Sequence, residues 1–158
     1  LFVVLQHCAV CASCWTGFLP IIVSMFVGRS SLRYGLAAEI GIQIINSGAS
    51  VAGVRGDGGF AMFIGELETA VRRRLPVLIV VLVDEALSQI KIGQERKGIP
   101  ATGTTFGSLD YPTLAKAFGA RGRDAETPAE CREAFAWALA GEGPAIVAAR
   151  IDPSGYKI

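Results

Sequence analysis

The sequence predicts an α/β protein: a parallel sheet with helices on both faces. Short apolar runs rich in β-branched residues alternate with helix-like segments along all 158 residues. The glycine-rich pairs that mark two-residue hairpins do not separate these runs, which favours crossover connections between parallel strands. The segment Val77–Val83 is almost entirely apolar, as expected of a central strand that is covered on both faces. The length suits one domain with a single core.

The strands and helices are expected in alternation. The expected strands are 1–5, 21–27, 50–54, 77–83, a short one beginning at 120–122, and 144–151. The expected helices are 8–15, 32–45, 60–74, 111–118 and 128–139, with a further helix starting near 85–92. Polar and glycine-rich residues make 93–107 the longest irregular stretch, and such stretches are often functional.

Capping residues and apolar stripes support several of these helices. Asp110 is the expected N-cap of helix 111–118. Thr127-Pro128-Ala129-Glu130 is a capping box with proline at the first helical position. In helix 32–45, the spacing of Leu36, Ile40 and Ile44 predicts a buried stripe.

Composition excludes some classes of function. The net charge of +1 and the absence of a basic stripe give no case for nucleic acid. The basic run 72–74 closes a predicted helix, where cations complement the helix dipole. The apolar runs 1–4 and 17–27 are too short or too interrupted to span a membrane. The cysteines suggest neither zinc nor disulfides, so we expect buried thiols and a cytoplasmic protein; they are Cys8, Cys11, Cys14 and Cys131.

Two acidic residues follow strands and mark the candidate site. Gly56-Asp57-Gly58-Gly59 ends one expected strand and opens a helix, and Asp84 ends the next strand 27 residues on (84 − 57). The carboxyl ends of parallel strands meet at one edge of a sheet, so the two carboxylates can hold one divalent cation. The glycines let a phosphate approach the backbone. Taken alone, the glycine motif is equally compatible with an ordinary strand–turn–helix connection in which Asp57 caps the helix.

These residues resemble the thiamin diphosphate motif of the acetolactate synthase-like enzymes, in which Gly-Asp-Gly is followed by a strand ending in Asn-Asn. Tyr34-Gly35-Leu36-Ala37-Ala38-Glu39-Ile40-Gly41 is similar to that family's YGLPAAIG helix, and 114–120 also matches its usual sequence. Gln6-His7 resembles the family's Gln-His pair. His7 to Leu32 and Leu32 to Asp57 are each 25 residues apart (32 − 7 and 57 − 32), as in the family.

The resemblance implies the thiamin diphosphate-binding fold and a role for each motif residue. Asp57, Asp84 and the Ala86 carbonyl would ligate Mg²⁺ together with diphosphate oxygens. The implied cofactor-binding residues are Gln6, His7, Ser31, Leu32, Gly56, Gly58 and Gly59. Leu32 would lie under the cofactor and bend it, and the cofactor itself would carry the 2-oxo acid chemistry.

The resemblance also implies a partner. In this family a glutamate from a pyrimidine-binding domain, usually on another chain, assists the cofactor, and nothing in residues 1–158 resembles that domain. We therefore expect a single diphosphate-binding domain, a fragment or subunit of an oligomer, that contains no catalytic residue of its own. Aromatic residues such as Trp15, Phe18, Phe26 and Tyr34 are candidates for that contact or for the core.

Four positions depart from the family pattern and leave a second function open. Val83-Asp84 replaces Asn-Asn, Leu5 and Arg33 replace glycines, and Ala37 replaces a proline. The alternative is a non-catalytic domain of the same fold with a structural or regulatory role in an oligomer. A Rossmann-type nucleotide site is disfavoured, because no GxGxxG motif opens the first helix.

Overall fold

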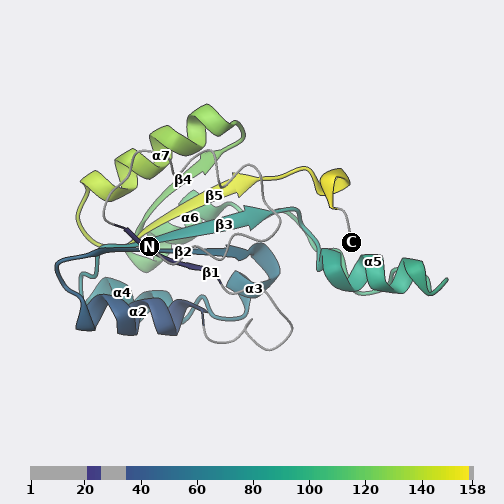
Figure 1. Ribbon diagram of the computed structural model, residues 1–158, viewed down its shortest axis with the longest axis horizontal. Coiled ribbons are helices and arrows are strands. Elements are labelled where there is room, and N and C mark those ends of the chain that lie inside the picture. Colours follow the sequence, from purple (N-terminus) through teal and green to yellow (C-terminus); the bar gives the residue numbers. More distant parts are fainter. Residues whose placement is uncertain (1–20, 26–34, 157–158) are drawn as a thin grey trace.

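The computed structural model of the chain describes residues 21–25 and 35–156 (Figure 1). The expected strand 1–5 and helix 8–15 lie outside these residues. None of the described helices is long and apolar enough to cross a membrane.

The described strands form one parallel five-stranded sheet in the order β1-β2-β3-β5-β4. The strands are β1 (Ile21–Met25), β2 (Ser50–Gly56), β3 (Val77–Val83), β4 (Arg121–Ala125) and β5 (Ala145–Arg150). The predicted parallel sheet is therefore confirmed. β3 is a central strand, and six of its seven residues are buried, as its apolar sequence predicts.

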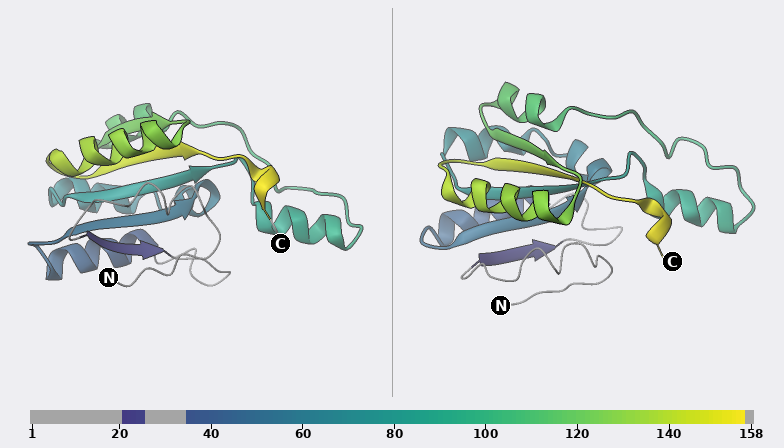
Figure 2. Two further views of the ribbon diagram at one scale, coloured as in Figure 1. Left: turned by 45° about the horizontal axis from the view of Figure 1, so that its top comes forward. Right: turned by 90° about the horizontal axis from the view of Figure 1, so that it is seen from above.

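Helices cover both faces of the sheet (Figures 1 and 2). They are α2 (Gly35–Ile45), α3 (Asp57–Ala61), α4 (Glu66–Arg72), α5 (Ser88–Arg96), α6 (Tyr111–Phe118) and α7 (Pro128–Ala140), followed by the 3₁₀ turn η1 (Pro153–Gly155). α7 packs on one face through Ala134, Phe135 and Ala138. α2, α4 and α6 pack on the other face, around Leu36, Leu67 and Ala115.

The predicted caps are confirmed. The Asp110 carboxylate accepts the Thr113 N–H at 2.9 Å and so begins α6. Thr127 and Glu130 form the reciprocal capping box at the start of α7. α6 ends at Gly119, whose φ of 84° is the left-handed conformation that glycine adopts without steric cost.

The predicted single helix 60–74 is wrong, because two short helices replace it. α3 begins earlier, at Asp57, and ends at Ala61, and α4 begins at Glu66. Between them, hydrogen bonds join residues three apart, such as Phe63 N–H to Phe60 O and Glu66 N–H to Phe63 O. Gly65, the last residue of this connection, has the low helix propensity that favours such a break.

The predicted stripe on α2 is wrong at its last position. Leu36 and Ile40 are buried, but Ile44 is 45% exposed. The buried face of α2 instead includes two polar residues, Glu39 and Gln43, which are 0% and 1% exposed. The Glu39 carboxylate pairs with the guanidinium of Arg55, near the end of β2. A buried carboxylate is tolerated because it has this partner.

α5 extends into the stretch that was expected to be irregular. It runs to Arg96, and none of its residues is buried. It projects beyond the ends of the strands (Figures 1 and 2). Residues 97–110 then return along an irregular path to α6.

We expect Gly53→Ala to destabilise the fold strongly. A β-carbon there would clash with the Glu39 carboxylate, so that carboxylate would have to move and its buried ion pair with Arg55 would be disrupted. Breaking such a pair costs about 3–5 kcal/mol. Gly41→Ala is the matched control, because a β-carbon at that helical position meets nothing within 4 Å; it should stabilise the chain by about 0.5–1 kcal/mol. Urea denaturation measures both changes, and equal effects would contradict the buried-pair account.

Candidate metal and diphosphate site

The buried carboxylate of Asp57 joins the ends of two neighbouring strands. Asp57 is only 2% exposed and is the first residue of α3, directly after β2. Its Oδ1 accepts the N–H of Gly58 at 2.7 Å. Its Oδ2 accepts two further N–H groups at the end of β3, from Asp84 at 3.1 Å and from Glu85 at 2.7 Å. The two expected acidic residues therefore meet at the same edge of the sheet.

The Asp84 carboxylate is held unequally at its two oxygens. Oδ2 accepts two hydroxyl groups, from Ser88 at 2.5 Å and from Tyr156 at 3.0 Å. Among the described residues, Oδ1 accepts only the Ala86 N–H, at the long distance of 3.3 Å. Asp84 is half-buried, so its Oδ1 keeps capacity for another ligand.

The turn after β3 is held in an unusual backbone conformation. Glu85 has a φ of 59°, which is rare for a residue with a β-carbon. This conformation aims the Glu85 N–H at Asp57. Ala86 then pairs with Thr105 in an isolated antiparallel bridge, whose hydrogen bonds use Glu85 O and Leu87 N–H. The Ala86 carbonyl is not used by this bridge.

Burial raises the pKa of Asp57 above its ordinary value, and the nearby charge of Asp84 raises it further. The N–H groups of Glu85 and Gly58 oppose this effect. A raised folded-state pKa means that ionised Asp57 reduces folding stability once the pH rises above the ordinary value near 3.8. A cation between the two carboxylates would remove this penalty.

Tyr111 packs against α3, the helix that begins at Asp57. Its ring is buried and lies 6.0 Å from that of Phe60 in α3. Burial, together with the charge of Asp57, raises the pKa of Tyr111 to about 12. The phenol is therefore protonated at neutral pH, and its role here is packing.

The glycines of the motif differ in their surroundings. A β-carbon at Gly56 would meet nothing within 4 Å. A β-carbon at Gly58 would lie 2.5 Å from Cδ2 of Leu87 and 3.5 Å from the ring of Phe106. The Gly58 N–H already donates to Asp57. Gly59 lies in the first turn of α3, where backbone N–H groups lack helical acceptors.

The structure thus brings together part of the expected site. Asp57, Asp84, Ala86 and the glycines 56, 58 and 59 converge, while Gln6, His7, Ser31 and Leu32 lie outside the described residues, as do Leu5 and Arg33. Sequence reasoning missed Ser88 and Tyr156 as partners of Asp84. Ser88 follows Asp84 by four residues and could have been noticed, but Tyr156 is 72 residues away and carries no local signal.

The donor set fits a divalent oxygen-seeking cation in combination with a polyanion. Within residues 21–25 and 35–156 no group of three histidine, cysteine or acidic side chains converges. Two carboxylates and a carbonyl are too few for an octahedral site, and Mg²⁺ commonly completes its shell with substrate phosphates. Each carboxylate can still accept a cation, because it has about four lone-pair positions and three of them accept hydrogen bonds.

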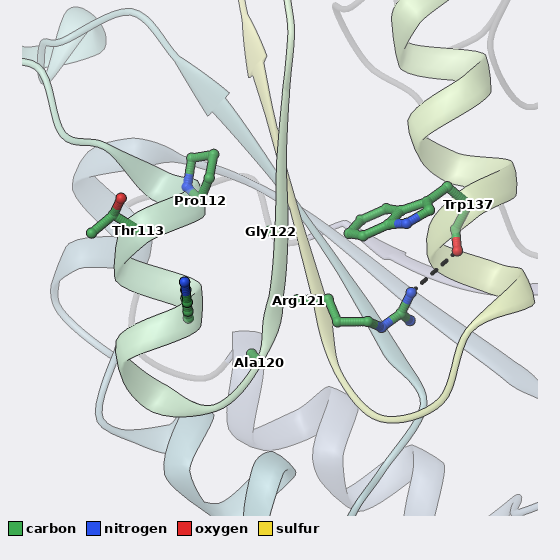
Figure 3. A pocket seen from close by; sticks show the side chains of 7 residues that line it. Pro112, Thr113, Ala120, Arg121, Gly122 and Trp137 are labelled. Atoms are coloured by element: carbon green, nitrogen blue, oxygen red, sulfur yellow. Dashed lines mark hydrogen bonds between the residues drawn. The ribbon is translucent and has the colours of Figure 1, made fainter.

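A separate hollow of about 350 Å³ lies at the β4 edge (Figure 3). α6 lines it on one side and Trp137 of α7 on the other. Arg121 also lines this hollow, and its guanidinium carbon lies 4.8 Å from the centre of the Trp137 ring. The guanidinium donates to the carbonyls of Trp137 and Ala138 in the last turn of α7 and of Glu142 just after it. Because these bonds occupy the guanidinium, we interpret Arg121 as a helix cap rather than a ligand-binding group.

Fold and site together define a parallel α/β domain with paired carboxylates at the carboxyl edge of its sheet. Residues 21–149 match the family described as "Thiamine pyrophosphate enzyme, C-terminal TPP binding domain". The chain belongs to this family.

Known relatives agree with that assignment. The chain is 31% identical over 135 residues to acetolactate synthase of Bacillus subtilis, covering 85% of this chain and 24% of the relative. It is 34% identical over 125 residues to the catabolic acetolactate synthase of Raoultella terrigena, covering 79% of this chain and 22% of the relative. The chain therefore spans about a quarter of the length of these relatives.

A solved structure supports the fold. Benzoylformate decarboxylase from Polynucleobacter necessarius superposes with a TM-score of 0.79 over 91% of this chain and 32% of that one. At 20% sequence identity this likeness concerns the fold alone.

We expect Glu85→Gly to stabilise the chain, because glycine adopts a positive φ without steric cost. The relief of about 1–2 kcal/mol, reduced by glycine's greater chain entropy, leaves a gain of about 0.5–1 kcal/mol. Glu85→Gln is the control, since it keeps the strain and removes only the exposed pairing with Arg150. If chemical denaturation shows the glycine variant to be no more stable than the glutamine variant, Glu85 is not strained.

Proposed function

We propose that this chain is the diphosphate-binding half of a thiamin diphosphate enzyme that decarboxylates or ligates 2-oxo acids. The observation that carries the proposal is the meeting of Asp57 and Asp84, 27 residues apart, at the ends of β2 and β3, where the Asp57 carboxylate accepts the backbone N–H groups of Asp84 and Glu85. Membership in the cofactor-binding family and the similarity to acetolactate synthases support the choice of cofactor and reaction class.

In this proposal Mg²⁺ binds Asp57, Asp84 and the Ala86 carbonyl. The least engaged oxygen of Asp84 is Oδ1, and the Ala86 carbonyl takes no part in the bridge to Thr105. The cation would balance the Asp84 charge, which together with burial now raises the pKa of Asp57. Diphosphate oxygens would complete the octahedral shell.

The cofactor's diphosphate would lie against the turn 56–59. Gly56 leaves room for a phosphate next to the backbone, whereas access to Gly58 requires a shift of the flexible Leu87 side chain. Gln6, His7, Ser31 and Leu32 are proposed as further cofactor contacts on sequence resemblance. When bound, thiamin diphosphate supplies the electron sink for decarboxylation of a 2-oxo acid.

The proposal requires a pyrimidine-binding domain from elsewhere. The chain spans about a quarter of the length of its relatives. The segment after β3 has the character of an interface: α5 buries none of its residues, and Ile90, Ile99, Phe106 and Leu109 are each 37–51% exposed. We propose that this surface faces the partner domain, in a homo- or hetero-oligomer.

Titration calorimetry with thiamin diphosphate in excess Mg²⁺ tests the proposed function, with and without a pyrimidine-binding domain. We expect Asp57→Ala to weaken binding by more than about tenfold, or about 1.4 kcal/mol, because it removes a cation ligand. Asp110→Ser is the matched control, since it removes an exposed carboxylate that accepts hydrogen bonds from Thr113 and not from the turns at Asp57 and Asp84, but keeps a capping side chain.

Two results would contradict the proposal. One is the absence of binding heat for the unmodified chain under both conditions. The other is binding that Asp57→Ala leaves unchanged, with circular dichroism confirming that the variant is folded. Association with partners that is stable and independent of cofactor would instead favour a structural or regulatory role.

A further inference from the structure

The C-terminal segment reaches back to the candidate cation site. After β5, the Ile151 N–H donates to Val83 O at 3.0 Å, so the chain continues alongside the end of β3. The turn η1 follows, capped by Asp152, which accepts both the N–H and the hydroxyl of Ser154. This turn lies beside the start of α5 (Figures 1 and 2). Its next residue, Tyr156, donates its hydroxyl to Asp84 Oδ2 at 3.0 Å.

Tyr156 donates a hydrogen bond to Asp84 from an element that is more firmly held than α5. The other hydroxyl on Oδ2 comes from Ser88, the first residue of α5. Because no residue of α5 is buried, the helix that carries Ser88 has little packing to fix its position. Tyr156 is half-buried and is tied to the sheet through β5. Two hydroxyls hold Oδ2, while Oδ1 accepts one long bond from the part of the chain that the structure describes.

We propose that Tyr156 is a positioning residue for the divalent cation: it holds Asp84 through Oδ2 so that Oδ1 is presented to the metal. The inference rests on the proposed function, since it assumes that Asp84 is a cation ligand. Carboxylate ligands are themselves oriented by hydrogen bonds, and loss of such a partner typically costs tenfold to a hundredfold in metal affinity.

The same contact couples the cation to the C-terminal segment in both directions. If Tyr156 strengthens cation binding through Asp84, then cation binding strengthens the Tyr156–Asp84 contact by the same factor. Bound cation should therefore slow hydrogen exchange in residues 151–156. A tyrosine that only packs locally would show no such dependence on the metal.

Water-proton relaxation of a fixed mixture of Mn²⁺ and thiamin diphosphate, titrated with the chain, tests the inference without an activity assay. We expect Tyr156→Phe to require about tenfold to a hundredfold more protein for the same enhancement. Ser88→Ala should shift the titration in the same direction. Ser154→Ala is the matched control: it removes a hydroxyl in the same turn that bonds to Asp152 and not to Asp84, so the titration should stay within about twofold.

The outcomes separate this inference from the proposed function. If the unmodified chain and Tyr156→Phe enhance relaxation equally, Tyr156 does not position the cation ligand, while the proposed site stands. Equal losses in Tyr156→Phe and Ser154→Ala would also overturn it, because the stability of the turn would then explain the effect. If the unmodified chain gives no enhancement at any concentration, either alone or with a pyrimidine-binding domain, both the site and the inference fail. Slower exchange of 151–156 on adding Mn²⁺, lost in Tyr156→Phe, is the expected second readout.

Discussion

The carboxylate of Asp57 is the constraint on which the functional edge of this domain depends. It is buried, yet it accepts three backbone N–H groups from two separate turns. These bonds fix the start of α3 relative to the end of β3, and they bring Asp84 beside Asp57. The same bonds hold two carboxylates close together at a poorly solvated position. Burial and the neighbouring charge both raise the pKa of Asp57 there. Such a pair is suited to a cation, which would neutralise the charge that the turn has concentrated.

Much of this arrangement could be predicted from local sequence. The apolar run of β3, the Asp110 cap and the capping box at Thr127 each specify an element by short-range chemistry, and the structure confirms them. The convergence of Asp57 and Asp84 also followed from sequence, because parallel strands place their carboxyl ends at one edge. Here the prediction depended on topology rather than on any side-chain detail.

The errors arose where a distant partner decides the structure. Glu39 and Gln43 are polar residues on the buried face of α2. Only the ion pair with Arg55 and the absence of a side chain at Gly53 explain why Glu39 is there. The break between α3 and α4 follows the early helix start at Asp57, which backbone bonds to the next strand help to fix. Tyr156 reaches Asp84 across 72 residues. None of these contacts leaves a pattern within a window of ten residues.

The central claim is that Asp57 and Asp84 bind one divalent cation that anchors a diphosphate. The most direct measurement is anomalous diffraction at the manganese edge from crystals of the chain grown with Mn²⁺ and thiamin diphosphate. The account predicts one manganese peak within about 2.0–2.3 Å of a carboxylate oxygen of both residues, with diphosphate oxygens in the same shell. A diphosphate bound elsewhere, or a peak that touches neither carboxylate, would contradict it.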